Sequence, residues 1–78
     1  MFIVMNKREI IVMVKSGSII RSVESFGDNR FLVKLELTEH NQINLEIPKI
    51  LAPELGIPPK NFELISGVDK NIKIFKIF

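Results

Sequence analysis

The sequence contains no cysteine, no tryptophan and no tyrosine, and its only histidine is His40. The lack of cysteine excludes disulfides and thiolate metal sites, and a site built from imidazoles would need further histidines that the chain does not have. We therefore expect no metal and no cofactor. A chain without cysteine also fits a reducing compartment, so we expect a cytoplasmic protein.

An excess of one charge is missing as well. The chain has 11 Lys and Arg residues against 9 Asp and Glu, which gives a net charge of +2, and the basic residues are spread among acidic ones. Such mixing is typical of a solvated surface rather than of a phosphate-binding patch. A long apolar run is also absent, because Met1 to Met5 is too short for a signal segment or a membrane span. We expect a protein that is neither exported nor bound to a membrane.

What the chain does have is enough apolar side chains for a core. Its 78 residues, of which 46% are hydrophobic, predict a single domain over residues 1–78. Residues 1–7 are either flexible or extend the first strand.

Most apolar residues alternate with polar ones, as in strands. The segment from Ile19 to Phe26 alternates poorly and predicts a short irregular strand or arm. In the last strand, Ile72 and Ile74 compete with Phe75 and Ile77 for the inward face, and a bulge would reconcile them. The four predicted strands are Arg8 to Lys15, Phe31 to Leu37, Asn61 to Ile65 and Asn71 to Phe78.

The segment from Asn41 to Pro58 is the only one with a helical period. Pro48 and Pro53 lack the N–H that a helix interior needs, so we predict a kinked or broken helix of two short pieces. Thr38 or Asn41 is expected to cap its start, and Gly56 its end. The apolar stripe consists of Ile43, Ile47, Ile50, Leu51 and Leu55.

Together these elements predict an α+β fold in two layers. The order ββαββ gives a mostly antiparallel, four-stranded sheet, covered on one face by one kinked helix. We prefer the strand order 1-2-4-3 over 1-2-3-4, because the closing strand is longer and more apolar than the one before it.

Several short motifs resemble those of the YggU-like family of small uncharacterised proteins. The segment from His40 to Asn44 lies over the D-G-K-A-N segment that opens the family's helix, and Leu55-Gly56-Ile57-Pro58 matches its L-G-V-P exit. Ser66-Gly67 matches the following S-G turn, Lys73 the lysine of the last strand, and Gly17 the glycine of the first turn. The chain departs from the family at Ser16, where a proline is usual, and it lacks the C-terminal helix. The resemblance implies a small domain of unknown function with no established reaction.

No carboxylate pair or nucleophile is spaced for catalysis, so we predict that the chain is not an enzyme. His40 reads as a solvated loop histidine. The resemblance makes Asn44, Ser66, Gly67 and Lys73 candidates for a shared polar site that binds an anion or RNA phosphate weakly. The alternative is that Asn44 caps locally, Gly67 serves a turn and Lys73 is a cation at the rim.

A second hypothesis is a protein-interaction module. Four apolar residues fall on the face of the sheet opposite the helix, where the sequence offers no second helix to cover them. Such a face suits a protein partner or a homodimer. The four residues are Ile11, Met13, Leu32 and Ile65.

Overall fold

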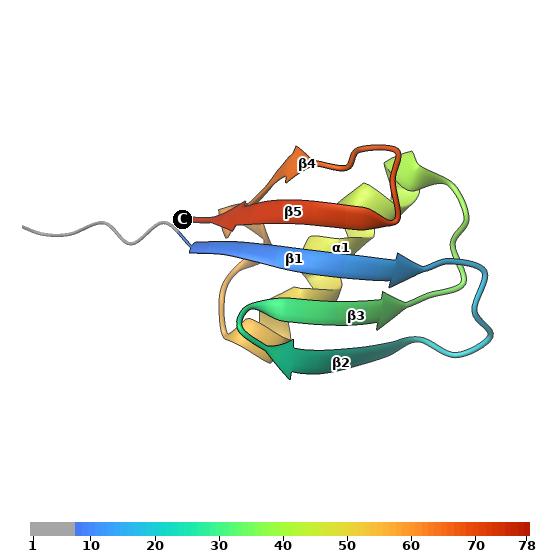
Figure 1. Ribbon diagram of the computed structural model, residues 1–78, viewed down its shortest axis with the longest axis horizontal. Coiled ribbons are helices and arrows are strands. Elements are labelled where there is room, and N and C mark those ends of the chain that lie inside the picture. The colour runs from blue at the N-terminus through green and yellow to red at the C-terminus, as the bar shows by residue number, and fades with distance from the viewer. Residues whose placement is uncertain (1–7) are drawn as a thin grey trace, which may run out of the picture.

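The computed structural model describes residues 8–78 and shows one α-helix lying across one face of a five-stranded sheet (Figure 1). The prediction for residues 1–7 lies outside the described residues. Within residues 8–78, no helix is both long and apolar enough to cross a membrane. The elements are β1 (Arg8–Lys15), β2 (Ser22–Gly27), β3 (Arg30–Lys34), α1 (His40–Leu55), the short 3₁₀ helix η1 (Pro59–Asn61), β4 (Phe62–Ser66) and β5 (Ile72–Ile77).

The sheet is mixed, and its strand order is β2-β3-β1-β5-β4. The prediction of four strands in the order 1-2-4-3 is wrong, and so is the order 1-2-3-4, because β5 lies beside β1 rather than beside β3. The strand left out of the predicted sheet is β2, which falls largely within Ile19 to Phe26, the segment predicted to be a short irregular strand or arm. The turn after β2 has positive φ angles at Gly27, Asp28 and Asn29, and it folds β2 and β3 into a hairpin. β3 then runs parallel to β1, so the sheet cannot be antiparallel throughout.

The core lies between the sheet and α1. Alternate residues of β1 and β3 point toward the helix as predicted, and β5 resolves its ambiguity by turning Phe75 and Ile77 inward. The predicted helical stripe faces them, with Ile43, Ile47 and Leu51 fully buried. The buried strand residues are Ile10, Val12, Val14, Phe31, Val33, Phe75 and Ile77.

The helix runs unbroken over 16 residues, although Pro48 and Pro53 lie inside it. The prediction of two short pieces is therefore wrong. Each proline costs about 3 kcal/mol in a helix interior, because it removes one backbone hydrogen bond. Burial of the three large stripe residues contributes about 1.5–3 kcal/mol each, a total of similar size that offsets the loss. The predicted cap at Thr38 or Asn41 is also wrong: Glu39 is the N-cap and makes no side-chain capping bond. Gly56 ends the helix in the left-handed conformation, as predicted.

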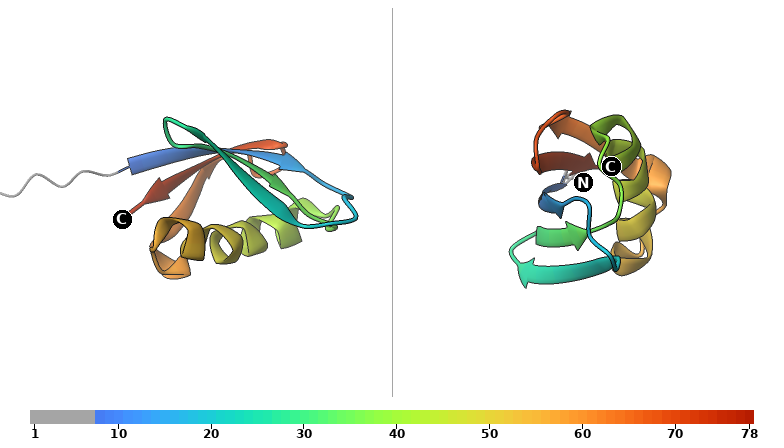
Figure 2. Two further views of the ribbon diagram at one scale, coloured as in Figure 1. Left: turned by 90° about the horizontal axis from the view of Figure 1, so that it is seen from below. Right: turned by 90° about the vertical axis from the view of Figure 1, so that its right-hand side faces the viewer.

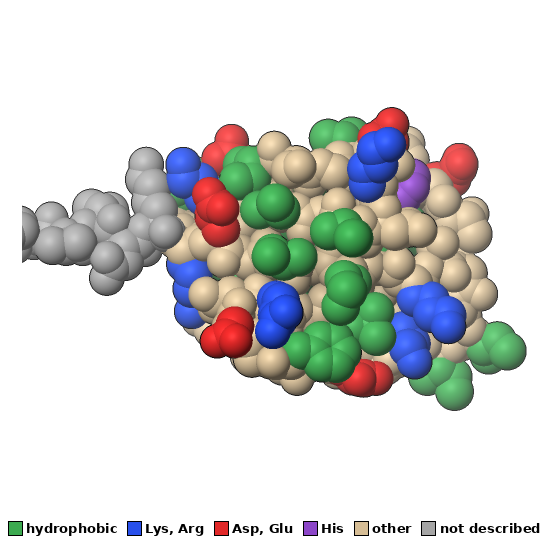
Figure 3. Space-filling view, in the orientation of Figure 1, with side chains coloured by type: hydrophobic (Ala, Val, Ile, Leu, Met, Phe, Trp, Pro, Cys, Tyr) green, Lys and Arg blue, Asp and Glu red, His purple; other side chains and the backbone are tan. Residues whose placement is uncertain are grey.

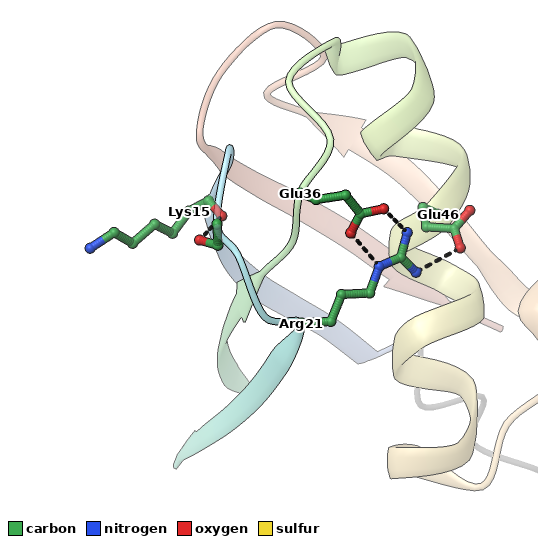
Figure 4. A network of polar contacts seen from close by, with 5 residues as sticks. Lys15, Arg21, Glu36 and Glu46 are labelled. Carbon is green, nitrogen blue, oxygen red and sulfur yellow. Dashed lines mark hydrogen bonds and ion pairs between the residues drawn. The ribbon is translucent and has the colours of Figure 1, made fainter.

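An arginine fixes the connection between β1 and β2 to the helix (Figure 4). Arg21 donates two hydrogen bonds to the Glu36 carboxylate, at 2.7 and 2.8 Å, and a third to Glu46 of α1 at 3.0 Å. The bonds from Arg21 hold the pKa of Glu36 at about 2, and the same bonds raise the pKa of Arg21. The connection is thereby tied to the segment between β3 and α1 and to α1 itself.

Candidate functional site

The first candidate site is built around the turn between β4 and β5. Gly67 has a φ of +85°, and a Cβ atom placed there would overlap with the carbonyl oxygen of Ile72. Only glycine fits such a position, because any side chain would collide with backbone. The turn therefore brings its own carbonyl groups close to the start of β5.

Lys73 of β5 points inward from this turn and is fully buried. Its ammonium group donates hydrogen bonds to the carbonyl oxygens of Gly67 at 2.8 Å and Val68 at 3.2 Å. Burial lowers the pKa of Lys73 because it removes water from the charged form, and nearby Asp69 partly opposes this effect. The interpretation of Lys73 as a cation at the rim is wrong.

Two residues from the first turns of α1 complete the cluster. The Nδ1 atom of His40 lies 3.2 Å from the Lys73 ammonium, so His40 is part of the helix rather than a solvated loop histidine. The Asn44 amide donates to the Val68 carbonyl at 2.9 Å. Its Oδ1 atom is buried and has no hydrogen-bond partner among residues 8–78. The helix start and the turn are thus joined through Lys73 and Asn44.

Three of the four predicted site residues meet here: Asn44, Gly67 and Lys73. Ser66 does not join them, because it is exposed and pairs with Ile74 on the other face of the sheet. His40 joins the cluster although the sequence analysis assigned it to a loop. The signal for the buried lysine was present, since Lys73 has the same parity as Phe75 and Ile77.

The donors of this cluster already face protein acceptors. An anion would have to draw the Lys73 ammonium away from the Gly67 and Val68 carbonyls, and it would bring no donor for Asn44 Oδ1. The geometry is that of a link holding the turn against the helix. Among residues 8–78, no group of three or more His, Cys, Asp or Glu side chains could hold a metal ion.

The second candidate site is the face of the sheet that the helix leaves bare, seen from the front in Figures 1 and 3 and edge-on in Figure 2. The four predicted face residues all lie on it: Ile11 and Ile65 are 39% and 45% exposed, and Met13 and Leu32 are half-buried. Three more apolar side chains, which the sequence analysis did not assign, extend the patch. The resulting apolar band consists of Phe26, Leu32, Met13, Ile11, Ile72, Ile74 and Ile65.

Strand pairing makes this apolar band continuous. Met13 of β1 lies opposite Leu32 of β3 on one side and Ile72 of β5 on the other. In the next row, Ile11 lies opposite Ile74. Paired residues in neighbouring strands point to the same face with their Cβ atoms about 4.5–5.5 Å apart, so these side chains contact one another across the sheet. Figure 3 shows hydrophobic side chains gathered across the middle of the face.

Charged rows close the apolar band at both ends. At the end where β1 begins, Glu9 and Glu63 flank Lys76, which gives one net negative charge; we call this the acidic row. At the other end, Lys15 pairs with Lys34, which gives two positive charges; we call this the lysine row. In the middle, a hollow of about 330 Å³ is lined by Ile11, Met13, Phe26 and Arg30. An apolar centre with a charged rim is the general anatomy of a protein interface.

Comparison with known proteins adds no assignment. No protein-family model matches the chain, and no solved structure matches it.

Proposed function

We propose that this chain is a small non-enzymatic binding module that uses the bare face of its sheet to bind protein. We also propose that the chain is a divergent member of the YggU-like family, which the motif resemblance supports. We further propose that it acts in the cytoplasm, which the absence of cysteine supports.

The observation that carries the proposal is the apolar band. Four of its members expose between 39% and 60% of their surface: Ile11, Phe26, Ile65 and Ile72. Single exposed apolar residues are ordinary on protein surfaces, but a contiguous patch with a polar rim marks an interaction site. When one face of a sheet is in water, the strand positions that point to that face are usually polar. In β1 and β5, the central positions that point to the bare face are apolar instead.

The hollow beside Ile11 suits a projecting apolar side chain of a partner. Its lining places Arg30 beside three apolar residues. Aromatic and arginine side chains around a desolvated pocket are common features of protein–protein hot spots. The polar cluster at Lys73 offers no comparable opening, because its lysine is buried.

Site-specific photo-crosslinking tests the proposal. A photoreactive residue in place of Ile11 should give a protein adduct of defined mass in cells that produce the chain. One in place of Leu45, which is 71% exposed on the helix, is the matched control and should give none. The Ile11 adduct should disappear when Ile72→Lys places a charge within the band. Equal yields from the two positions, or an adduct that survives Ile72→Lys, would contradict the proposal.

The sequence also suggested RNA or phosphate binding through Asn44, Ser66, Gly67 and Lys73. The hydrogen bonds of Lys73 to the turn carbonyls disfavour this candidate, since its donors face inward. Titration with a short RNA at low salt, followed by NMR chemical shifts, tests it. Chemical-shift changes clustered at these four residues would support RNA or phosphate binding at this site, and changes that do not cluster there would exclude it.

A further inference from the structure

We infer that the partner of the bare sheet face is a second copy of this chain, bound face to face about a twofold axis that lies in the interface and runs across the strands. The inference rests on the proposed function, because it names the partner for the same surface.

The face carries opposite charges at its two ends. The acidic row combines Glu9 and Glu63 with Lys76, whereas the lysine row combines Lys15 with Lys34. The apolar band lies between the two rows, together with Arg30 opposite Ile11 and Glu24 opposite Leu32, whose charges cancel. The face is therefore polarised along the strand direction, and a surface of this kind is complementary to itself when one copy is reversed.

Two symmetric ways of stacking such faces can be compared. A twofold axis parallel to the strands would place the lysine row over the lysine row of the second copy, and the acidic row over the acidic row. In both places, rows of like charge would face and repel each other. An axis across the strands reverses one copy end to end, so that each lysine row meets an acidic row. The strands of the two sheets then remain aligned, which is a common packing of sheet on sheet.

The central strand supplies the clearest pair. Glu9 and Lys15 lie on β1, near opposite ends of the strand, and both point to the bare face. Because β1 is the middle strand of five, a twofold axis crossing it near Val12 places Glu9 of each copy opposite Lys15 of the other. Each dimer would contain this contact twice.

The size of the face sets the strength of the contact. Strands about 4.8 Å apart, with same-face side chains about 6.7 Å apart, give a face on the order of 500 Å² per copy. The total of roughly 1,000 Å² is at the lower limit for a specific interface. We therefore expect a dimer that dissociates on dilution, and that weakens as salt screens the charged rows.

Charge exchange on β1 tests the arrangement. Sedimentation equilibrium at low salt, on full-length chains whose folding is checked by thermal unfolding, should show wild-type dimers. Glu9→Lys should weaken self-association at least tenfold, because the introduced ammonium group then meets Lys15 of the second copy. Lys15→Glu should do the same through two facing carboxylates. An equimolar mixture of the two variants should restore dimers, and so should the double variant E9K/K15E.

The remaining outcomes separate this inference from the proposed function. If Ile11→Lys abolishes association while both charge variants associate like wild type, the face is the interface but the axis is wrong. If the wild type stays monomeric at about 1 mM, the second copy is excluded as the partner. The crosslinking experiment decides the proposed function separately. An Ile11 adduct at twice the 9.0 kDa chain mass supports the second copy as the partner, whereas an adduct of any other mass supports the proposed function but overturns the second copy. Equal yields at Ile11 and Leu45 contradict both.

Discussion

Replacing Lys73 with methionine tests how the buried lysine acts. Lys73→Met keeps an unbranched side chain of similar length in the core but removes the ammonium group. Two carbonyl oxygens lose a donor, yet each keeps another: Gly67 accepts from the Lys70 N–H at 3.1 Å, and Val68 accepts from the Asn44 amide at 2.9 Å. Neither of these two carbonyls is left without a partner.

The expected change in the free energy of unfolding follows from these contacts. The lowered pKa of Lys73 means that the folded protein disfavours the charged form relative to water. Removing a buried charge whose two carbonyl partners stay satisfied is often neutral or stabilising, and His40, whose Nδ1 atom loses its contact with the ammonium group, is only half-buried. We expect Lys73→Met to change the free energy of unfolding by less than about 1 kcal/mol. Lys73→Ala, which leaves a cavity, should cost about 2–4 kcal/mol.

The pH dependence of stability tests the effect of burying the Lys73 ammonium group in a second way. Between the lowered pKa of Lys73 in the folded state and its ordinary value of 10.5, the unfolded chain holds the proton that the folded chain has released. Stability rises with pH wherever the unfolded state binds more protons. Wild type should therefore gain stability relative to Lys73→Met as the pH rises toward 10.5, as measured by urea unfolding. A loss above about 3 kcal/mol in Lys73→Met at pH 7, or a fall in relative stability with rising pH, would refute the reasoning.

Three further predictions concern the turn, the arginine link and the helix. Gly67→Ala should cost at least about 2 kcal/mol in thermal unfolding, because the new methyl group collides with the Ile72 carbonyl; a neutral effect would contradict the turn geometry. The Glu36 carboxyl should titrate with a pKa of about 2 by NMR and return toward its ordinary value of 4.5 in Arg21→Gln, so that the stability contributed by their contact is lost as the pH falls from 4.5 through 2. Pro48→Ala should stabilise the protein by about 1–3 kcal/mol, since it supplies the missing helical N–H; destabilisation would argue against an unbroken helix there.

Local periodicity was enough to predict the elements that bury a regular stripe. β1 and the buried positions of α1 follow from alternation and from the helical period, because their side chains pack on one continuous core. The bounds of β1 are those predicted. The prolines misled the prediction because local propensity was weighed without the burial of Ile43, Ile47 and Leu51, which holds the helix together.

Strand order could not be predicted in the same way. It depends on contacts between residues distant in sequence, and β2 is an edge strand whose mostly exposed residues give little alternation. Once β2 was missed, the hairpin between β2 and β3 and the parallel pairing of β1 with β3 were missed too.

The candidate sites could likewise be predicted only in part, because they too depend on strand order and on which face each residue occupies. The four predicted face residues lie on one surface, but Phe26, Ile72 and Ile74 were not assigned to it because β2 and the parity of β5 were unknown. Lys73 was considered only as a site residue or as a cation at the rim, although its parity with Phe75 pointed inward. Side-chain chemistry was given more weight there than strand geometry, and the geometry decided the outcome.

The central claim is that a second copy covers the bare sheet face. Its most direct test is the accessibility of methyl groups to a soluble paramagnetic probe, measured by NMR at about 20 μM and about 1 mM protein. The account predicts that the methyl groups of Ile11, Ile72 and Ile74 become protected at the higher concentration, while those of Ile19 and Leu45, which are 98% and 71% exposed, stay accessible. Equal accessibility of the Ile11, Ile72 and Ile74 methyl groups at both concentrations would contradict it.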